Sequence, residues 1–172
     1  MKYSIQFVLG LALLCIEVFG RELVPGSLWT PPLLLIFILW LGTGVVRVPH
    51  VIMIWILSLL ADGLSSSPVG THMLRFGPIH IGTILLSQKL SLNRAFGASV
   101  LGALGCVLDL VMIAMITRFA FPDAVLNERI SALMMLQLIM GTLIAPLLFP
   151  VLDRFGRWQK RSRTTMSIGS GD

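Results

Sequence analysis

The stretch VIMIWILSLLADGLSSSPVG, residues 51–70, joins an apolar run to a carboxylate and then to a cluster of turn-forming residues. The apolar run to Leu64 has the composition of a membrane-embedded helix. The serines, Pro68 and Gly70 that follow break a helix and build an ordered turn. A carboxylate at membrane depth is energetically costly, so Asp62 requires a partner or a function.

The composition of the whole chain places this stretch in an integral membrane protein. Of the 172 residues, 56% are hydrophobic and 12% are charged, and the mean hydropathy is +0.91. This leaves too little polar surface to cover a soluble globule. At about 20 to 25 residues per span, the chain has room for five or six membrane-spanning helices. We therefore expect an all-α integral membrane protein, a compact bundle of about six transmembrane helices, with no separate soluble catalytic domain.

Hydropathy and turn signals divide the chain into six predicted spans. They run at about 3–20, 31–46, 51–64, 71–90, 93–119 and 130–152. The second and third are short, so a five-span arrangement with one re-entrant segment is the alternative. Pro78 is expected to kink the fourth span, and Arg75 to snorkel from it. The polytopic transmembrane domain is predicted to cover 1–155, and a basic, disordered tail 156–172.

Basic residues are distributed unevenly over the predicted turns. The side that both termini share holds nine of them: Lys2, Arg47, Lys89, Arg94, Arg154, Arg157, Lys160, Arg161 and Arg163. The opposite side holds four: Arg21, Arg75, Arg118 and Arg129. An excess of Lys and Arg marks the cytoplasmic side, so both termini are predicted to be cytoplasmic. Because these residues flank apolar spans, the net charge of +5 is interpreted as a topology signal, with no nucleic-acid partner.

Two interpretations apply to Asp62, which lies near the non-cytoplasmic end of the third predicted span. It can accept hydrogen bonds from backbone N–H groups of the turn to Gly70, or pair with Arg75 about one helical turn into the next span. Both of these roles are structural. The functional alternative is a ligand for a transported ion or a substrate, and the sequence favours the structural interpretation.

Asp109 lies in the middle of the fifth predicted span, with no charged residue within a turn on either side. It is therefore expected to face the interior of the bundle. One interpretation is a buried acid hydrogen-bonded to a serine, a threonine or a backbone carbonyl, and the other is a proton or substrate site. A proton path usually shows several aligned polar residues, and the sequence singles out only Asp109. Glu17 is assigned a plain i, i+4 pair with Arg21.

Small residues recur at steps of four on the fifth span and on its approach. One row comprises Ser91, Ala95, Ser99 and Ala103, and the adjoining row comprises Ala98, Gly102 and Cys106. Small side chains let another helix approach closely, which is a main source of helix association in lipid. We expect an internal packing face, the alternative being a docking face for another membrane protein.

The sequence contains no recognisable catalytic, cofactor or metal constellation. No histidine accompanies a nucleophile, and no glycine loop has the pattern that cradles a phosphate. His50, His72 and His80 lack the i, i+4 spacing of a metal-binding helix face and are interpreted as interfacial. Cys15 and Cys106 lie in apolar stretches, where a thiol behaves as a small hydrophobe. We expect no enzymatic activity, no cofactor and no metal.

The segment 52–70 and Asp109 resemble the rod shape-determining protein MreD family. In that family, an aspartate near the end of a short span precedes a few small residues, then proline, one residue and glycine, as in Asp62, Pro68 and Gly70. A second aspartate lies in a later span. The likeness also covers span number, chain length, the short apolar second span and the basic tail. It implies a fold like that of the substrate-binding subunits of energy-coupling vitamin transporters.

The resemblance implies a non-enzymatic component of the bacterial cell-elongation complex, which maintains rod shape. Such a protein is a multi-pass protein of the bacterial inner membrane. It binds the single-span protein MreC and helps couple MreB filaments to RodA and its penicillin-binding transpeptidase in lateral peptidoglycan synthesis. The candidates for a structural or partner-binding role are Asp62, Pro68, Gly70, Asp109 and Arg75. Membrane lipid is the other expected partner of the protein.

The alternative function is that of a substrate-binding membrane subunit of an energy-coupling vitamin transporter. Its ligand pocket would be lined by Asp62, the serines at 65–67, Thr71 and His72. Such subunits tend to carry a repeated alanine step on the first span for docking their energising partner. The first span here reads LGLALL at 9–14 and lacks that step, which favours the shape-determining function. A free-standing channel or carrier is disfavoured, because few polar residues align along several spans.

Overall fold

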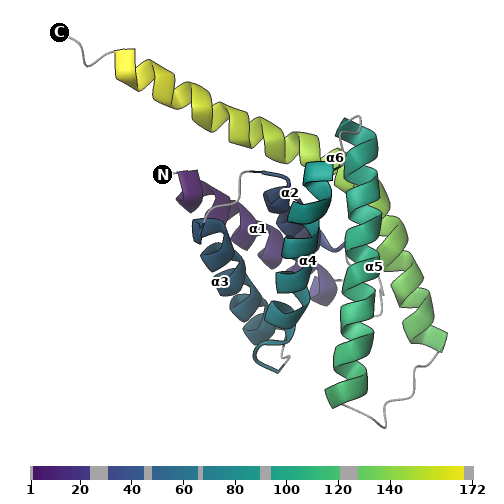
Figure 1. Ribbon diagram of the computed structural model, residues 1–172. Coiled ribbons are helices and arrows are strands. Elements are labelled where there is room, and N and C mark those ends of the chain that lie inside the picture. Colours follow the sequence, from purple (N-terminus) through teal and green to yellow (C-terminus); the bar gives the residue numbers. More distant parts are fainter. Residues whose placement is uncertain are drawn as a thin grey trace.

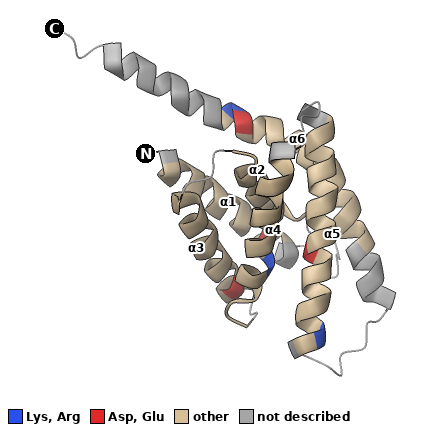
Figure 2. Ribbon diagram, viewed as in Figure 1, with Lys and Arg blue, Asp and Glu red and all other residues tan. Residues whose placement is uncertain are grey.

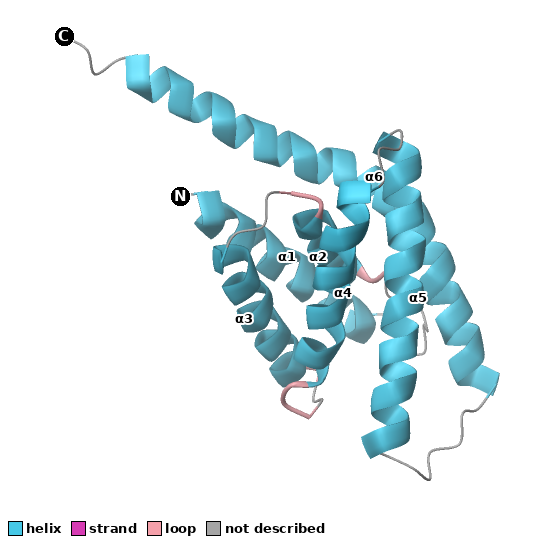
Figure 3. Cartoon of the chain, in the orientation of Figure 1, coloured by secondary structure: helices cyan, strands magenta, loops and turns pink. Residues whose placement is uncertain are grey.

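The computed structural model describes residues 2–23, 31–44, 48–65, 68–89, 94–120 and 128–168. All six elements of this part of the chain are α-helices (Figures 1 and 3). They are α1 (Lys2–Leu23), α2 (Leu33–Gly42), α3 (Val48–Leu64), α4 (Thr71–Lys89), α5 (Arg94–Ala120) and α6 (Glu128–Ile168). The expected all-α architecture and the six helical segments agree with this arrangement.

Three of the helices are long and apolar enough to cross a membrane. Their candidate spans are Tyr3–Gly20 in α1, Phe96–Phe119 in α5 and Met135–Phe155 in α6. The helices α2 and α3 are shorter apolar helices. At about 1.5 Å per residue, the ten residues of α2 extend about half of the roughly 30 Å hydrocarbon core, so α2 does not cross a membrane by itself. The re-entrant alternative for this segment is consistent with its length.

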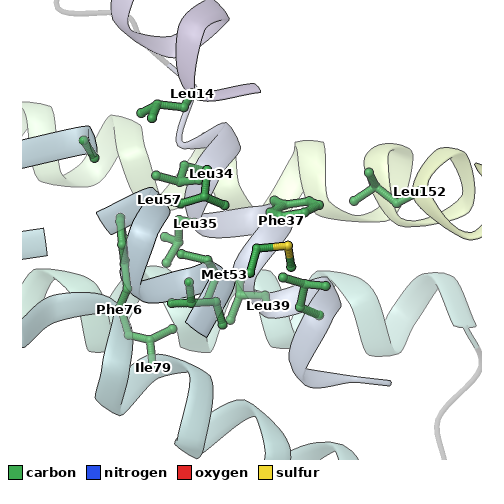
Figure 4. Packing of buried hydrophobic residues seen from close by; sticks show 14 of the residues in the cluster. Leu14, Leu34, Leu35, Phe37, Leu39, Met53, Leu57, Phe76, Ile79 and Leu152 are labelled. Atoms are coloured by element: carbon green, nitrogen blue, oxygen red, sulfur yellow. The ribbon is translucent and has the colours of Figure 1, made fainter. Parts of the chain in front are cut away.

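The short helix α2 lies at the centre of the bundle, in contact with α1, α4, α5 and α6. Nine of its ten residues are buried, because its sequence LLLIFILWLG is apolar on every side. Figure 4 shows Phe37 and Leu39 of α2 within a cluster that includes Leu57 of α3 and Phe76 and Ile79 of α4. The core is therefore built around α2.

The row of small residues that contains Gly102 and Cys106 packs against α6, as expected for an internal packing face. A Cβ atom added to Gly102 would lie 2.6 Å from the carbonyl oxygen of Gly141 and 2.7 Å from Cβ of Ala145. A Cβ atom on Gly141 would in turn overlap the sulfur of Cys106, which is fully buried. The close approach of the two backbones thus depends on glycine at both positions.

The first part of α6 runs beside α5. The helix then changes direction, and its far end points away from the bundle (Figure 1). Pro146 and Pro150 lie inside α6, and each removes a backbone N–H donor from the helical ladder. The backbone stays helical to Ile168, well beyond the predicted end of the last span at 152. The division into a transmembrane domain to 155 and a disordered tail from 156 stays a prediction. Residues 169–172 of the predicted tail lie outside the described residues.

Figure 1 places the N-terminal end of α1 and the far end of α6 toward the same end of the bundle. The placement of both termini on the cytoplasmic side of a membrane stays a prediction. Charged residues are sparse along the described part of the ribbon, most of which is tan in Figure 2. Large apolar side chains are exposed on α1, α3, α5 and α6, among them Val8, Trp55, Val107 and Leu143. In a membrane, these outward faces meet lipid.

Candidate functional site

The carboxylate of Asp62, at the end of α3, closes the turn into α4. Its Oδ2 accepts a hydrogen bond from the backbone N–H of Gly70 at 2.7 Å, and its Oδ1 accepts one from the backbone N–H of His72 at 2.9 Å. The prediction that Asp62 binds backbone N–H groups of this turn is confirmed. Because the first N–H groups of a helix have no partner within it, this carboxylate acts as a cap for α4.

A side chain of α4 completes the surroundings of Asp62. The Nδ1 atom of His72 lies 2.7 Å from Oδ1 of the carboxylate, and Asp62 is only 1% exposed. His72 is 9% exposed, so the acid and its histidine partner are both buried within the bundle. The buried carboxylate of Asp62 therefore has three hydrogen-bond donors. They supply the partners that a carboxylate needs when it is removed from water.

Pro68 and Gly70 shape the same turn through the backbone. Gly70 has a φ of +95°, which L side chains rarely adopt, so glycine is required here by conformation. The carbonyl of Pro68 accepts hydrogen bonds from the backbone N–H of Thr71 at 3.1 Å and from its hydroxyl at 2.7 Å. The hydroxyl of Thr71 thus stabilises the turn, and the carboxylate of Asp62 supplies the cap of α4.

Asp109, in the middle of α5, forms a two-pronged ion pair with Arg75 of α4. Arg75 donates from Nε to Oδ1 at 2.9 Å and from Nη2 to Oδ2 at 2.7 Å. The side chain of Asp109 is 1% exposed and that of Arg75 is 17% exposed. The expectation that Arg75 snorkels or pairs with Asp62 is therefore wrong, and so is the expectation of a neutral partner for Asp109. Pairing with a guanidinium neutralises a charge whose burial alone is costly.

Gln137 of α6 provides a third donor to the same carboxylate, from Nε2 to Oδ2 at 2.8 Å. The interior cluster of Arg75, Asp109 and Gln137 thus joins α4, α5 and α6. Sequence reasoning missed Gln137. The available signal was a lone side-chain amide within the apolar run 132–141, which in a membrane helix marks a hydrogen bond to a neighbouring helix.

Asp62, Pro68, Gly70 and His72 are called the turn cluster below. Phe76 of α4 contacts one member of each cluster, His72 of the turn cluster and Arg75 of the interior cluster. The guanidinium carbon of Arg75 lies 5.5 Å from the centre of the Phe76 ring. The centre of the His72 ring is also 5.5 Å from the centre of the Phe76 ring. A guanidinium near an aromatic face is stabilised by the ring quadrupole. The ring, 4% exposed, thus packs beside a basic side chain of each cluster.

Other polar residues found by sequence reasoning lie elsewhere. Glu17 accepts a hydrogen bond from the backbone N–H of Leu34 at 2.9 Å, which ties α1 to the start of α2. The side chain of its expected partner Arg21 lies outside the described residues. His50 lies 3.3 Å from the amide of Gln6, while His80 is 4% exposed and its two ring nitrogens have no hydrogen-bond partner among the described residues.

The described residues contain no group of three His, Cys, Asp or Glu that could hold a metal ion. Both motif acids are buried, and every one of their oxygens accepts a hydrogen bond from another part of the bundle. Chemically, the two clusters can hold helices in register and neutralise buried charge. The comparisons with known proteins found no matching family model, no similar curated protein and no similar solved structure.

Proposed function

We propose that this protein is a non-enzymatic, multi-pass component of the bacterial cell-elongation complex, of the kind that the resemblance to the MreD family implies. It resides in the bacterial inner membrane with both termini in the cytoplasm. There it binds MreC and helps couple MreB filaments to lateral peptidoglycan synthesis by RodA and its penicillin-binding transpeptidase. The observation that carries the proposal is that Asp62 and Asp109, the two acids of the resemblance, both form hydrogen bonds to a neighbouring helix.

The turn cluster supports the proposal through the residues that carry the resemblance. Asp62, Pro68 and Gly70 are brought together by the turn, where the acid binds the backbone N–H of Gly70 and the proline carbonyl starts α4. A ligand-binding acid needs free lone pairs directed into a pocket. Here the lone pairs are directed at the chain itself, which favours a scaffold over a subunit that captures a small molecule.

The interior cluster supports the same proposal. Asp109 receives three side-chain donors from two neighbouring helices, so its charge is used to fix the arrangement of α4, α5 and α6. A rigid bundle with apolar outer faces offers a surface on which the single transmembrane helix of MreC can pack. Association of helices in lipid is driven by such close packing, and it needs no catalytic group.

The proposal is tested by affinity purification of the tagged protein from its native membranes in mild detergent, followed by mass spectrometry. Recovery of MreC together with RodA and the transpeptidase is the expected result. Recovery of paired ATPases with a coupling membrane subunit would overturn it and assign the protein to vitamin transport.

A second measurement addresses the role of the interior cluster in binding. The Asp109→Leu variant, co-expressed with MreC, is expected to recover several-fold less MreC, because the partner surface depends on the arrangement of α4 to α6. The matched control is Gly77→Ala on α4, where an added Cβ meets nothing within 4 Å and recovery should be unchanged. Size-exclusion profiles of both variants are compared with that of the native protein. If the Asp109→Leu variant is monodisperse, equally heat-stable and binds MreC equally well, this account of the interior cluster is refuted.

A further inference from the structure

The part of α6 beyond Pro150, residues 151–168, extends away from the bundle as a continuous helix and is called the α6 extension below (Figure 1). Its first residues, 151–155, are the last ones of the apolar candidate span of α6, which closes at Phe155. The end of a membrane span lies at the boundary between hydrocarbon and lipid headgroups. The extension therefore reaches the depth of the headgroups near Phe155.

The start of the α6 extension is fixed to the bundle by two contacts. Leu152 is 2% exposed within the core, and Oδ1 of Asp153 accepts a hydrogen bond from Nε1 of Trp40 at 2.9 Å. Directly afterwards, Arg154 is exposed and Phe155 is 50% exposed. The bundle thus sets the place at which the helix leaves, and the residues that follow depart from its core.

The sequence of the extension is strongly basic. Five basic residues occur within ten positions: Arg154, Arg157, Lys160, Arg161 and Arg163. No acidic residue occurs from 154 to 171, and the acid that precedes them, Asp153, is already hydrogen-bonded to Trp40. The extension therefore carries a concentrated positive charge that no neighbouring acid in the sequence offsets.

Apolar and basic positions follow the helical repeat in separate rows. Val151, Phe155 and Trp158 recur at steps of four and three, whereas the basic positions 154, 157 and 161 recur at steps of three and four on another row. On a helix, such spacing assigns the two rows to different sides. A helix with an apolar side and a Lys- and Arg-rich side is typical of a segment that lies in the plane of a membrane interface.

We propose that the α6 extension lies along the membrane surface and binds anionic phospholipid headgroups. The partner is a lipid surface, because the extension continues a candidate membrane span and reaches headgroup depth near Phe155. Guanidinium and ammonium groups are strong donors to phosphate, and each basic residue near an anionic surface shifts the equilibrium toward the surface by roughly five-fold. Surface binding would hold the extension at a fixed angle to the bundle, independently of any role in cell elongation.

The test is hydrogen–deuterium exchange, read by mass spectrometry, on the full chain in lipid nanodiscs. One set of discs contains phosphatidylcholine only, and the other contains phosphatidylcholine with phosphatidylglycerol at about 30% to supply the negative surface. Backbone amides of 156–168 are expected to exchange at least about ten-fold more slowly in the anionic discs, a conservative figure for five basic residues. Raising the salt concentration should remove the difference, since screening weakens exposed charge interactions.

Two variants separate charge from other effects. A charge-neutral variant is expected to show the same exchange in both discs, while a variant with two uncharged substitutions in the same helix should keep the difference. The charge-neutral variant carries Arg154→Gln, Arg157→Gln, Lys160→Gln, Arg161→Gln and Arg163→Gln, and the control carries Thr164→Gln and Thr165→Gln. Equal exchange of the native chain in both lipids would overturn the proposal, and so would a lipid-dependent difference that persists in the charge-neutral variant.

Discussion

Replacing Asp109 with leucine removes the acceptor of three side-chain hydrogen bonds and leaves the guanidinium of Arg75 among apolar side chains. The converse change, Arg75→Met, leaves a carboxylate that is only 1% exposed with Gln137 as its remaining side-chain donor. The double variant Arg75→Met/Asp109→Leu removes both charges together and replaces them with apolar side chains of similar size. These three variants and the native chain form a double-mutant cycle.

The expected magnitudes follow from the burial of the two groups. Breaking a buried ion pair by removing one partner costs about 3–5 kcal/mol, whereas replacing both partners with apolar groups is often close to neutral. Because Arg75 retains 17% exposure of its side chain, Asp109→Leu should fall near the lower end of that range, and Arg75→Met should cost more. The loss in the double variant is expected to be at least about 3 kcal/mol smaller than the sum of the single losses.

The assay is reversible unfolding of the purified protein in mixed micelles titrated with a denaturing detergent and followed by tryptophan fluorescence. Thr142→Val is the matched control on α6, since its hydroxyl donates only to the carbonyl of Leu138 within the same helix, and it should cost less than about 1 kcal/mol. The reasoning is refuted if Asp109→Leu costs no more than this control, or if the two single losses add in the double variant.

Three further changes are expected to alter stability in the same assay. Gly102→Ala places a Cβ atom 2.6 Å from a carbonyl oxygen of α6 and should cost about 1–3 kcal/mol, whereas Gly82→Ala, with an ordinary contact of 3.5 Å, should be neutral or stabilising; equal effects would contradict the packing argument. Gly70→Ala should cost about 1–3 kcal/mol because φ is +95°, while Gly77→Ala should gain up to about 1 kcal/mol from helix propensity. Asp62→Asn should cost about 1–3 kcal/mol, since an amide keeps only one acceptor for the two N–H groups that the carboxylate binds; an unchanged midpoint would refute the capping role.

Local features of the fold could be predicted from sequence with good agreement. The bounds of α3 and α4 follow from the breaker cluster between them, and the hydrogen bonds of Asp62 to that turn were anticipated because the acid lies directly beside it. The packing row of Ala98, Gly102 and Cys106 was also visible, since small residues at steps of four share one side of a helix. Each of these predictions depends on residues close together in the sequence.

The features that were missed join distant parts of the chain. Arg75 and Asp109 are 34 residues apart, and Gln137 is 28 residues beyond Asp109. Hydrophobic periodicity is uninformative about which side of a membrane helix faces another helix, because lipid and protein interior are both apolar. The burial of His72 and His80 and the central place of α2 were missed for the same reason.

The pattern of residues along the chain predicts an all-helical protein with apolar spans, the positions of the main helix breaks, and the requirement that two acids in apolar spans be neutralised or bonded. The tertiary structure decided how that requirement is met: Asp62 by the turn and His72, Asp109 by Arg75 and Gln137. The physical reason is that a buried charge must have a partner wherever it lies, but the identity of the partner depends on which helices pack side by side and how each is rotated.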